Sequence, residues 1–182
     1  MPFARITLAA ALALGALSAQ AADPTAALDR SFVEYTGIGP IGNNNLHSTD
    51  FYWMFESTGM YGSQAVNSWF LIWEPTRARV SGSVTFDAPI LYMLDDQAAL
   101  IATAALGKPG VNYDYSNPSI GLEVVDQSAT SFTGSTLTLA WNASDPGDHV
   151  RILTAVPEPQ TYALMLAGLG MTAWFARRRR PG

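Results

Sequence analysis

The sequence predicts an all-β fold, a single β-sandwich or jelly-roll-like domain between an N-terminal signal peptide and a C-terminal transmembrane helix. Three observations support this prediction: alternating apolar and polar residues, short segments rich in β-branched and aromatic residues, and clusters of Gly, Pro, Asn and Asp between them. The alternation is clearest over 79–86, where Val80, Val84 and Phe86 interleave with polar residues. Such a strand has one face in water, and many short strands favour two packed sheets.

Two segments carry apolar side chains on both faces, which is typical of central strands covered on both sides. These segments are 68–74, with the sequence SWFLIWE, and 50–56, with the sequence DFYWMFE. Further strands are expected at 31–36, 90–94, 121–126, 136–142 and 149–155. The apolar run 98–106 permits one short helix, because Asp96 could cap its start and Gly107 its end.

The first 21 residues have the pattern of a secretory signal peptide. Arg5 precedes an apolar run over 6–17, and Ala19, Gln20 and Ala21 form a small-x-small cleavage site. A buried N-terminal helix would instead show a polar face. We therefore expect export through the inner membrane and removal of residues 1–21.

A second apolar segment lies near the C-terminus. Residues 160–176 contain no charge and would form a helix about 26 Å long, slightly shorter than a hydrocarbon core of about 30 Å. We expect a membrane helix over 162–175, with the apolar residues Tyr162, Leu164, Leu166, Leu169, Trp174 and Phe175. A basic cluster follows, Arg177, Arg178, Arg179 and Arg180. A core helix rarely adjoins such a cluster, whereas positive-inside topology places it in the cytoplasm.

The residues Pro157, Glu158 and Pro159 stand immediately before this apolar segment. The order of Pro-Glu-Pro, short apolar helix and arginine cluster resembles the PEP-CTERM sorting signal, which membrane proteases called exosortases read in Gram-negative bacteria. The resemblance covers about 26 of the 182 residues. It implies that the three motif residues are recognised by an exosortase, that the helix holds the unprocessed chain in the inner membrane, and that the mature protein is linked to exopolysaccharide and biofilm.

The chemistry of the motif permits two interpretations. Proline fixes φ and lacks an N–H group, so a Pro-x-Pro segment stays extended and can be gripped by a protease. A simple linker that holds the body above the bilayer would explain the prolines equally well. The expected organisation is thus a signal peptide over 1–21, a β-sandwich body over 22–155 and a sorting signal over 156–182.

Charge and cysteine content exclude several classes of function. Residues 22–156 include fourteen acidic and five basic side chains. An acidic body is repelled by phosphate backbones, so we expect no nucleic-acid partner. The chain has no cysteine, which excludes disulfides, thiolate metal sites and cysteine nucleophiles.

The body shows no convincing catalytic or metal motif. His47 and His149 lack a metal-ligand spacing, and we expect both at the surface beside turn residues. The segment 145–148, Asp-Pro-Gly-Asp, is predicted to be a tight turn whose side chains cap backbone N–H groups, in preference to a calcium or acid-base site. Asp95 and Asp96 are expected in a turn or helix cap. We expect no cofactor, no metal site and no enzymatic activity.

The aromatic residues leave one binding hypothesis open. Those most readily placed in the core are Trp53, Trp69, Trp73 and Trp141. One of these tryptophans, or Tyr113 or Tyr115, could instead form a platform on which a sugar ring stacks. Tyr113 and Tyr115 lie in a loop rich in Gly, Asn and Pro, and they are the two aromatic residues least readily placed in a core. The sequence thus favours a noncatalytic exported cell-surface or extracellular-matrix protein. A carbohydrate-binding module is the alternative, followed by an exported hydrolase.

Overall fold

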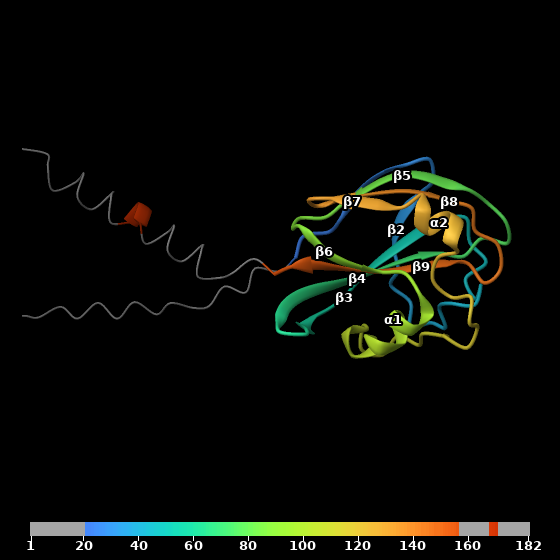
Figure 1. Ribbon diagram of the computed structural model, residues 1–182, viewed down its shortest axis with the longest axis horizontal. Helices are drawn as coiled ribbons and strands as arrows, with labels where there is room; N and C mark the ends of the chain where they lie inside the picture. The colour runs from blue at the N-terminus through green and yellow to red at the C-terminus, as the bar shows by residue number, and fades with distance from the viewer. Residues whose placement is uncertain (1–20, 157–167, 171–182) are drawn as a thin grey trace, which may run out of the picture. The chain divides into compact units, whose positions relative to one another are not determined.

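The computed structural model describes residues 21–156 and 168–170, and Ala21–Val156 forms one compact unit, hereafter the body (Figure 1). The strands of the body are β1 Thr25–Leu28, β2 Phe32–Glu34, β3 Phe51–Tyr61, β4 Gln64–Trp73, β5 Val80–Thr85, β6 Ile90–Leu94, β7 Ser131–Thr133, β8 Thr136–Trp141 and β9 Asp148–Ala155. Its helices are α1 Gln97–Ala102, the 3₁₀ helix η1 Ala104–Leu106 and α2 Val124–Ser128. The body is mostly β-sheet, which confirms the all-β prediction.

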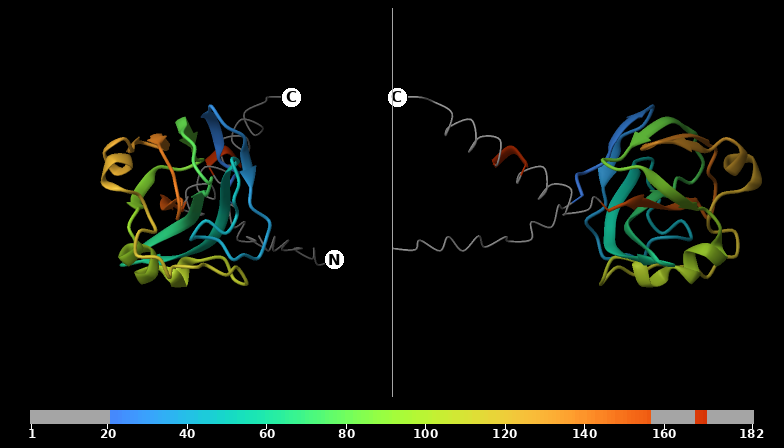
Figure 2. Two further views of the ribbon diagram at one scale, coloured as in Figure 1. Left: turned by 90° about the vertical axis from the view of Figure 1, so that its right-hand side faces the viewer. Right: turned by 60° about the vertical axis from the view of Figure 1, so that its left-hand side comes forward.

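The strands form two sheets. The first has the order β1-β5-β8-β7 and the second the order β2-β3-β4-β9-β6. Strands β2 and β3 run parallel, while the other neighbouring strands in the body pair antiparallel. Helices α1 and α2 occupy different layers in every view of Figures 1 and 2. Helix α1 lies under the second sheet, whereas α2 contacts β8 of the first.

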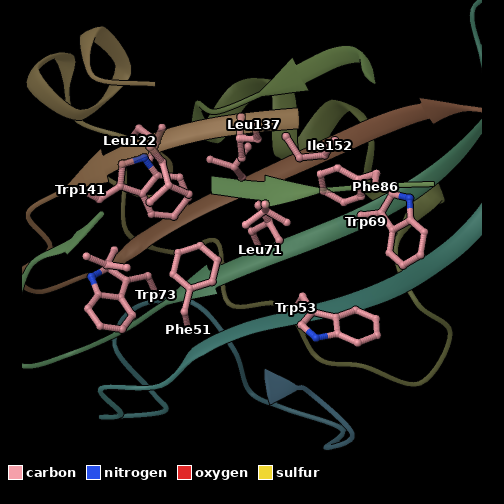
Figure 3. Packing of buried hydrophobic residues seen from close by; sticks show 14 of the residues in the cluster. Phe51, Trp53, Trp69, Leu71, Trp73, Phe86, Leu122, Leu137, Trp141 and Ile152 are labelled. Carbon is pink, nitrogen blue, oxygen red and sulfur yellow. The ribbon is translucent and has the colours of Figure 1, made fainter. Parts of the chain in front are cut away.

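A large aromatic core fills the space between the two sheets (Figure 3). Phe51 of β3 meets Trp141 of β8 with ring centroids 5.2 Å apart, so the sheets face each other across this contact. All four tryptophans that the sequence assigns to the core are buried there. That prediction is confirmed, because large aromatic rings bury the most apolar area for each residue placed in the core.

A second core lies on the other face of the second sheet. Strand β4 directs Trp69 and Leu71 into the first core, and it directs Phe70 and Ile72 into the second. Leu100 of α1 covers this second face and is fully buried. The expectation of a central strand covered on both sides is therefore confirmed for β4, which alternates its side chains between two buried surfaces.

The segment 121–126 is not the predicted strand. The chain forms helix α2 there, and Val124 and Val125 are 76% and 75% exposed. The buried residues of this segment are Gly121, Leu122 and Asp126. In a strand Val124 would share one face with Leu122 and Asp126, so its exposure shows that the period of two is broken here.

The sequence pattern does not predict strands β1 and β7, but it does predict the start of helix α1. Strands β1 and β7 are short edge strands with mostly exposed side chains, so no alternation marks them. Helix α1 begins as expected, because the Asp96 carboxylate accepts the Ala99 N–H at 2.9 Å. Gly107 closes η1 directly after it.

The predicted targeting segments lie almost entirely outside the described residues. This holds for residues 1–20 of the signal peptide, for Pro157, Glu158 and Pro159, and for the arginine cluster 177–180. Within the membrane helix predicted over 162–175, the described residues 168–170 are helical. In the portion of the chain that is described, no helix has the length and apolarity needed to cross a membrane.

Candidate functional site

A buried ion pair occupies the second core. Glu56 lies at a β-bulge of β3, where the register against β4 shifts between Phe55 and Ser57. The Arg151 guanidinium of β9 donates from Nε to Glu56 Oε2 at 2.6 Å and from Nη2 to Oε1 at 2.8 Å. A β-bulge changes the direction of its extra side chain. Here the Glu56 carboxylate makes a bidentate contact with Arg151, which is the strongest form of an Arg-carboxylate pair.

The same ion pair fastens α1 to the sheet. Arg151 Nη1 donates to the carbonyl oxygen of Leu100 at 3.0 Å and to Thr103 Oγ1 at 2.7 Å. On the opposite side, the Ser68 hydroxyl donates to Glu56 Oε2 at 2.6 Å. Burial alone would lower the pKa of Arg151, but its hydrogen bonds to Glu56 and the carboxylate charge raise that pKa above the usual value. The guanidinium therefore stays charged while buried.

Tyr113 and Tyr115 lie against the second core, which corrects the expectation that they stand outside a core. The Tyr113 ring meets Phe70 edge-on at 5.3 Å and stacks on Tyr115 at 5.8 Å. The Tyr113 hydroxyl donates to Glu56 Oε1 at 2.7 Å, and the Tyr115 hydroxyl accepts from Arg151 at 3.3 Å. Burial raises the pKa of Tyr115 to about 12 and also raises that of Tyr113, to which Glu56 adds.

These contacts predict that Tyr113→Phe destabilises the body by about 1–3 kcal/mol, because the Lys108 N–H and Glu56 each lose a hydrogen-bond partner inside the protein. Urea denaturation followed by tryptophan fluorescence measures the change. Tyr92→Phe is the matched control, since Tyr92 is 39% exposed and its hydroxyl contact is 3.5 Å long. A ring that serves mainly as a sugar platform would tolerate both substitutions equally.

His149 is buried and hydrogen-bonded to Glu74, so its predicted position at the surface is wrong. Its side chain has no exposed surface, and Nε2 lies 2.7 Å from Glu74 Oε1. Glu74 also accepts the N–H groups of Gly42 and Leu46, the latter at 2.8 Å. A buried position is consistent with the side-chain alternation of β9, because His149 falls on the same face as Arg151. His47 is exposed as expected.

The turn at 145–148 forms, but one of its acids behaves differently from the prediction. Gly147 donates its N–H to the carbonyl oxygen of Ser144 at 2.5 Å, as in a tight turn. Asp148 is fully buried, and neither of its carboxylate oxygens accepts a hydrogen bond from an N–H or hydroxyl group. The predicted cap of a backbone N–H by this side chain is therefore wrong.

An open surface depression lies where β1 leads into β2. It is lined by Leu28, Asp29, Arg30, Ser31, Thr49 and Asp50. The Asp29 carboxylate accepts the Ser81 N–H at 2.9 Å and the Ser81 hydroxyl at 3.2 Å. These contacts hold the pKa of Asp29 below its usual value. Asp29 thus serves as a fixed acceptor that attaches the end of β1 to β5.

The comparison with known proteins identifies the C-terminal part of the chain. The family model of the PEP-CTERM protein-sorting motif matches residues 155–180, which confirms the resemblance seen in the sequence. No curated protein and no solved structure matches the chain. The match begins at Ala155, the last residue of β9. The motif implies processing by an exosortase and export to the cell envelope or surface. The chain therefore carries a PEP-CTERM protein-sorting motif at residues 155–180.

Proposed function

We propose that this chain is a noncatalytic protein of the cell surface or extracellular matrix that associates with exopolysaccharide in a biofilm. The match of the sorting motif to residues 155–180 is the observation that carries the proposal. The signal peptide predicted over 1–21 would bring the chain across the inner membrane, and the sorting motif would direct its release or attachment.

The contacts of the body support a structural role over a catalytic one. The buried Glu56 carboxylate accepts hydrogen bonds from Arg151, and the buried Glu74 carboxylate contacts His149 and accepts two backbone N–H groups. The two tyrosines that the sequence offers as a sugar platform have their hydroxyls in the same network. These polar groups hold loops and α1 on the sheet, which is the task of a stable exported scaffold.

The role of Glu158 can be tested without disturbing the body. The last ladder pair of β9 joins Ala155 to Val66, so Glu158 lies three residues beyond the sheet along the chain. We expect Glu158→Ala to leave the body folded and to block exosortase processing, since a protease reads side chains that a linker does not use. A linker would tolerate the substitution, because a spacer depends on length more than on composition.

The experiment compares expression hosts with and without an exosortase. Immunoblots of membrane and medium should show a shortened band for the wild-type chain in the exosortase host and an unprocessed band for Glu158→Ala. Glu34→Ala is the matched control, because Glu34 is an exposed residue of β2 in the body, and it should be processed like the wild type. Equal band sizes for the wild-type chain in both hosts would overturn the sorting role.

Association with exopolysaccharide needs its own measurement. Cosedimentation of the processed protein with exopolysaccharide from the same host should move the protein into the pellet. Protein that stays entirely in the supernatant would contradict the proposal. Saturable binding of a defined oligosaccharide would favour a carbohydrate-binding module instead, and release of reducing sugar would favour a hydrolase.

A further inference from the structure

Three acidic side chains come together where α2 and β9 begin. Glu123 immediately precedes α2, Asp126 lies in its first turn, and Asp148 is the first residue of β9. One carboxylate oxygen from each residue lies within 4.8 Å of the other two. Three like charges at this separation repel one another strongly unless something neutralises them.

Asp148 is the member of this acidic trio that most needs a partner. Its side chain has no exposed surface, and neither carboxylate oxygen accepts a hydrogen bond from an N–H or hydroxyl group. Strand alternation places it on the same face of β9 as Val150 and Ile152, which belong to the core between the sheets. A buried carboxylate is tolerated only when it is paired, coordinates a metal or takes up a proton.

The cations of the body do not neutralise the trio. Arg151 contacts Glu56 and His149 contacts Glu74, so neither of these pairs includes one of the three acids. Burial raises the pKa of Asp148 to about 9, and the charges of Glu123 and Asp126 and a side-chain hydrogen bond with Glu123 add to this effect. When no ion is bound, Asp148 therefore carries a proton at neutral pH, and a bound cation would have to replace that proton.

We propose that Glu123, Asp126 and Asp148 bind one calcium ion. Calcium is held by oxygen ligands at about 2.3–2.6 Å, so two ligands on opposite sides of one ion lie about 5 Å apart. The separations within the trio fit that limit. The three donors are all carboxylates, which suit a hard cation better than zinc or copper.

The surroundings of the trio suit an ion that enters from solvent. Glu123 is exposed, whereas Asp126 and Asp148 are buried, so the ion would pass Glu123 to reach the inner pair. Asp126 Oδ1 accepts the Asn142 N–H at 3.2 Å, which orients its carboxylate. The bound ion would join Asp126 of α2 to Asp148 of β9 and so stabilise the folded body.

Calcium titration of the full chain tests the proposal. The chain is purified in detergent, treated with a chelator and titrated with calcium chloride in a calorimeter at constant ionic strength. One-site binding is expected, with a dissociation constant of about 0.1–1 mM, the range of extracellular calcium modules. At 10 mM calcium chloride the melting temperature should rise by about 5–10 °C.

Three variants give the test its specificity. Asp148→Asn should abolish binding, while Asp145→Asn, the same change at an exposed residue of the same turn, should bind like the wild type. Glu123→Gln alters an exposed ligand that the fold does not need, so it keeps the test valid if Asp148→Asn fails to fold, and it should weaken binding at least tenfold. Absence of calcium binding to the wild-type chain would overturn the proposal and indicate a protonated Asp148. Unchanged binding in Asp148→Asn or Glu123→Gln would overturn it as well.

Discussion

Glu56→Gln should lower the free energy of unfolding of the body by about 3–5 kcal/mol. The substitution removes one partner of a fully buried ion pair and leaves the Arg151 charge without a counter-ion, which is the costly case for buried charges. The amide of Gln would also turn its NH₂ group toward a donor, because both carboxylate oxygens of Glu56 accept hydrogen bonds from Arg151.

Urea denaturation of the wild-type and variant chains measures this loss. Glu34→Gln is the control at an exposed glutamate, and its effect should stay within about 0.5 kcal/mol. The double variant Glu56→Leu/Arg151→Met should recover much of the stability that Glu56→Gln loses, because apolar replacement of both partners removes the uncompensated charge. A single variant that unfolds at the same urea concentration as the wild type would show that the ion pair does not stabilise the body.

The strands that the sequence predicts best are those whose own residues report their burial. Strand β6 begins and ends where expected. Strand β4 shows apolar side chains at every position from Trp69 to Trp73, and both of its faces are buried. The start of helix α1 was also predictable, because the Asp96 side chain caps it through a hydrogen bond to the N–H of Ala99, only three positions along the chain. In each case the signal and the structure lie in the same short segment.

The polar interior could not be predicted in this way, because its partners are far apart in sequence. Glu56 and Arg151 are separated by 95 positions, and Glu74 and His149 by 75. Each residue alone reads as a charged group at the end of a strand or beside a turn. Glu56 lies on β3 and Glu74 directly follows β4, so these residues meet only because β3 pairs with β4 and β4 pairs with β9. These pairings are not visible in the local pattern.

The acidic trio shows the same limit. Glu123 and Asp126 precede two strands of the first sheet, and Asp148 follows them. A search for short metal-binding motifs therefore misses this group, because Asp148 is far from Glu123 and Asp126 in sequence and close to them only in the fold. The missing signal is burial: Asp148 is enclosed because β9 starts inside the core rather than at the surface.

Glu74→Ala should also lower the free energy of unfolding strongly, because it removes the contacts that hold the loop over 42–47. The Glu74 carboxylate accepts the N–H groups of Gly42 and Leu46 and contacts His149 Nε2. In this loop Asn43, Asn44 and His47 have positive φ angles of 54°, 56° and 46°. Residues other than glycine keep such a conformation only when their surroundings hold them in it, and Glu74 supplies two of those backbone contacts.

Loss of this acceptor should lower the free energy of unfolding by about 3 kcal/mol or more, since each buried donor left without a partner costs about 1–3 kcal/mol. Hydrogen exchange under native conditions should show faster exchange at the Gly42 and Leu46 amides than in the wild-type chain. Glu34→Ala, at an exposed position, should leave both the stability and these two amides unchanged. Unaltered protection of Gly42 and Leu46 in Glu74→Ala would mean that the loop is held by its own contacts, and that the carboxylate serves only as the hydrogen-bond partner of His149.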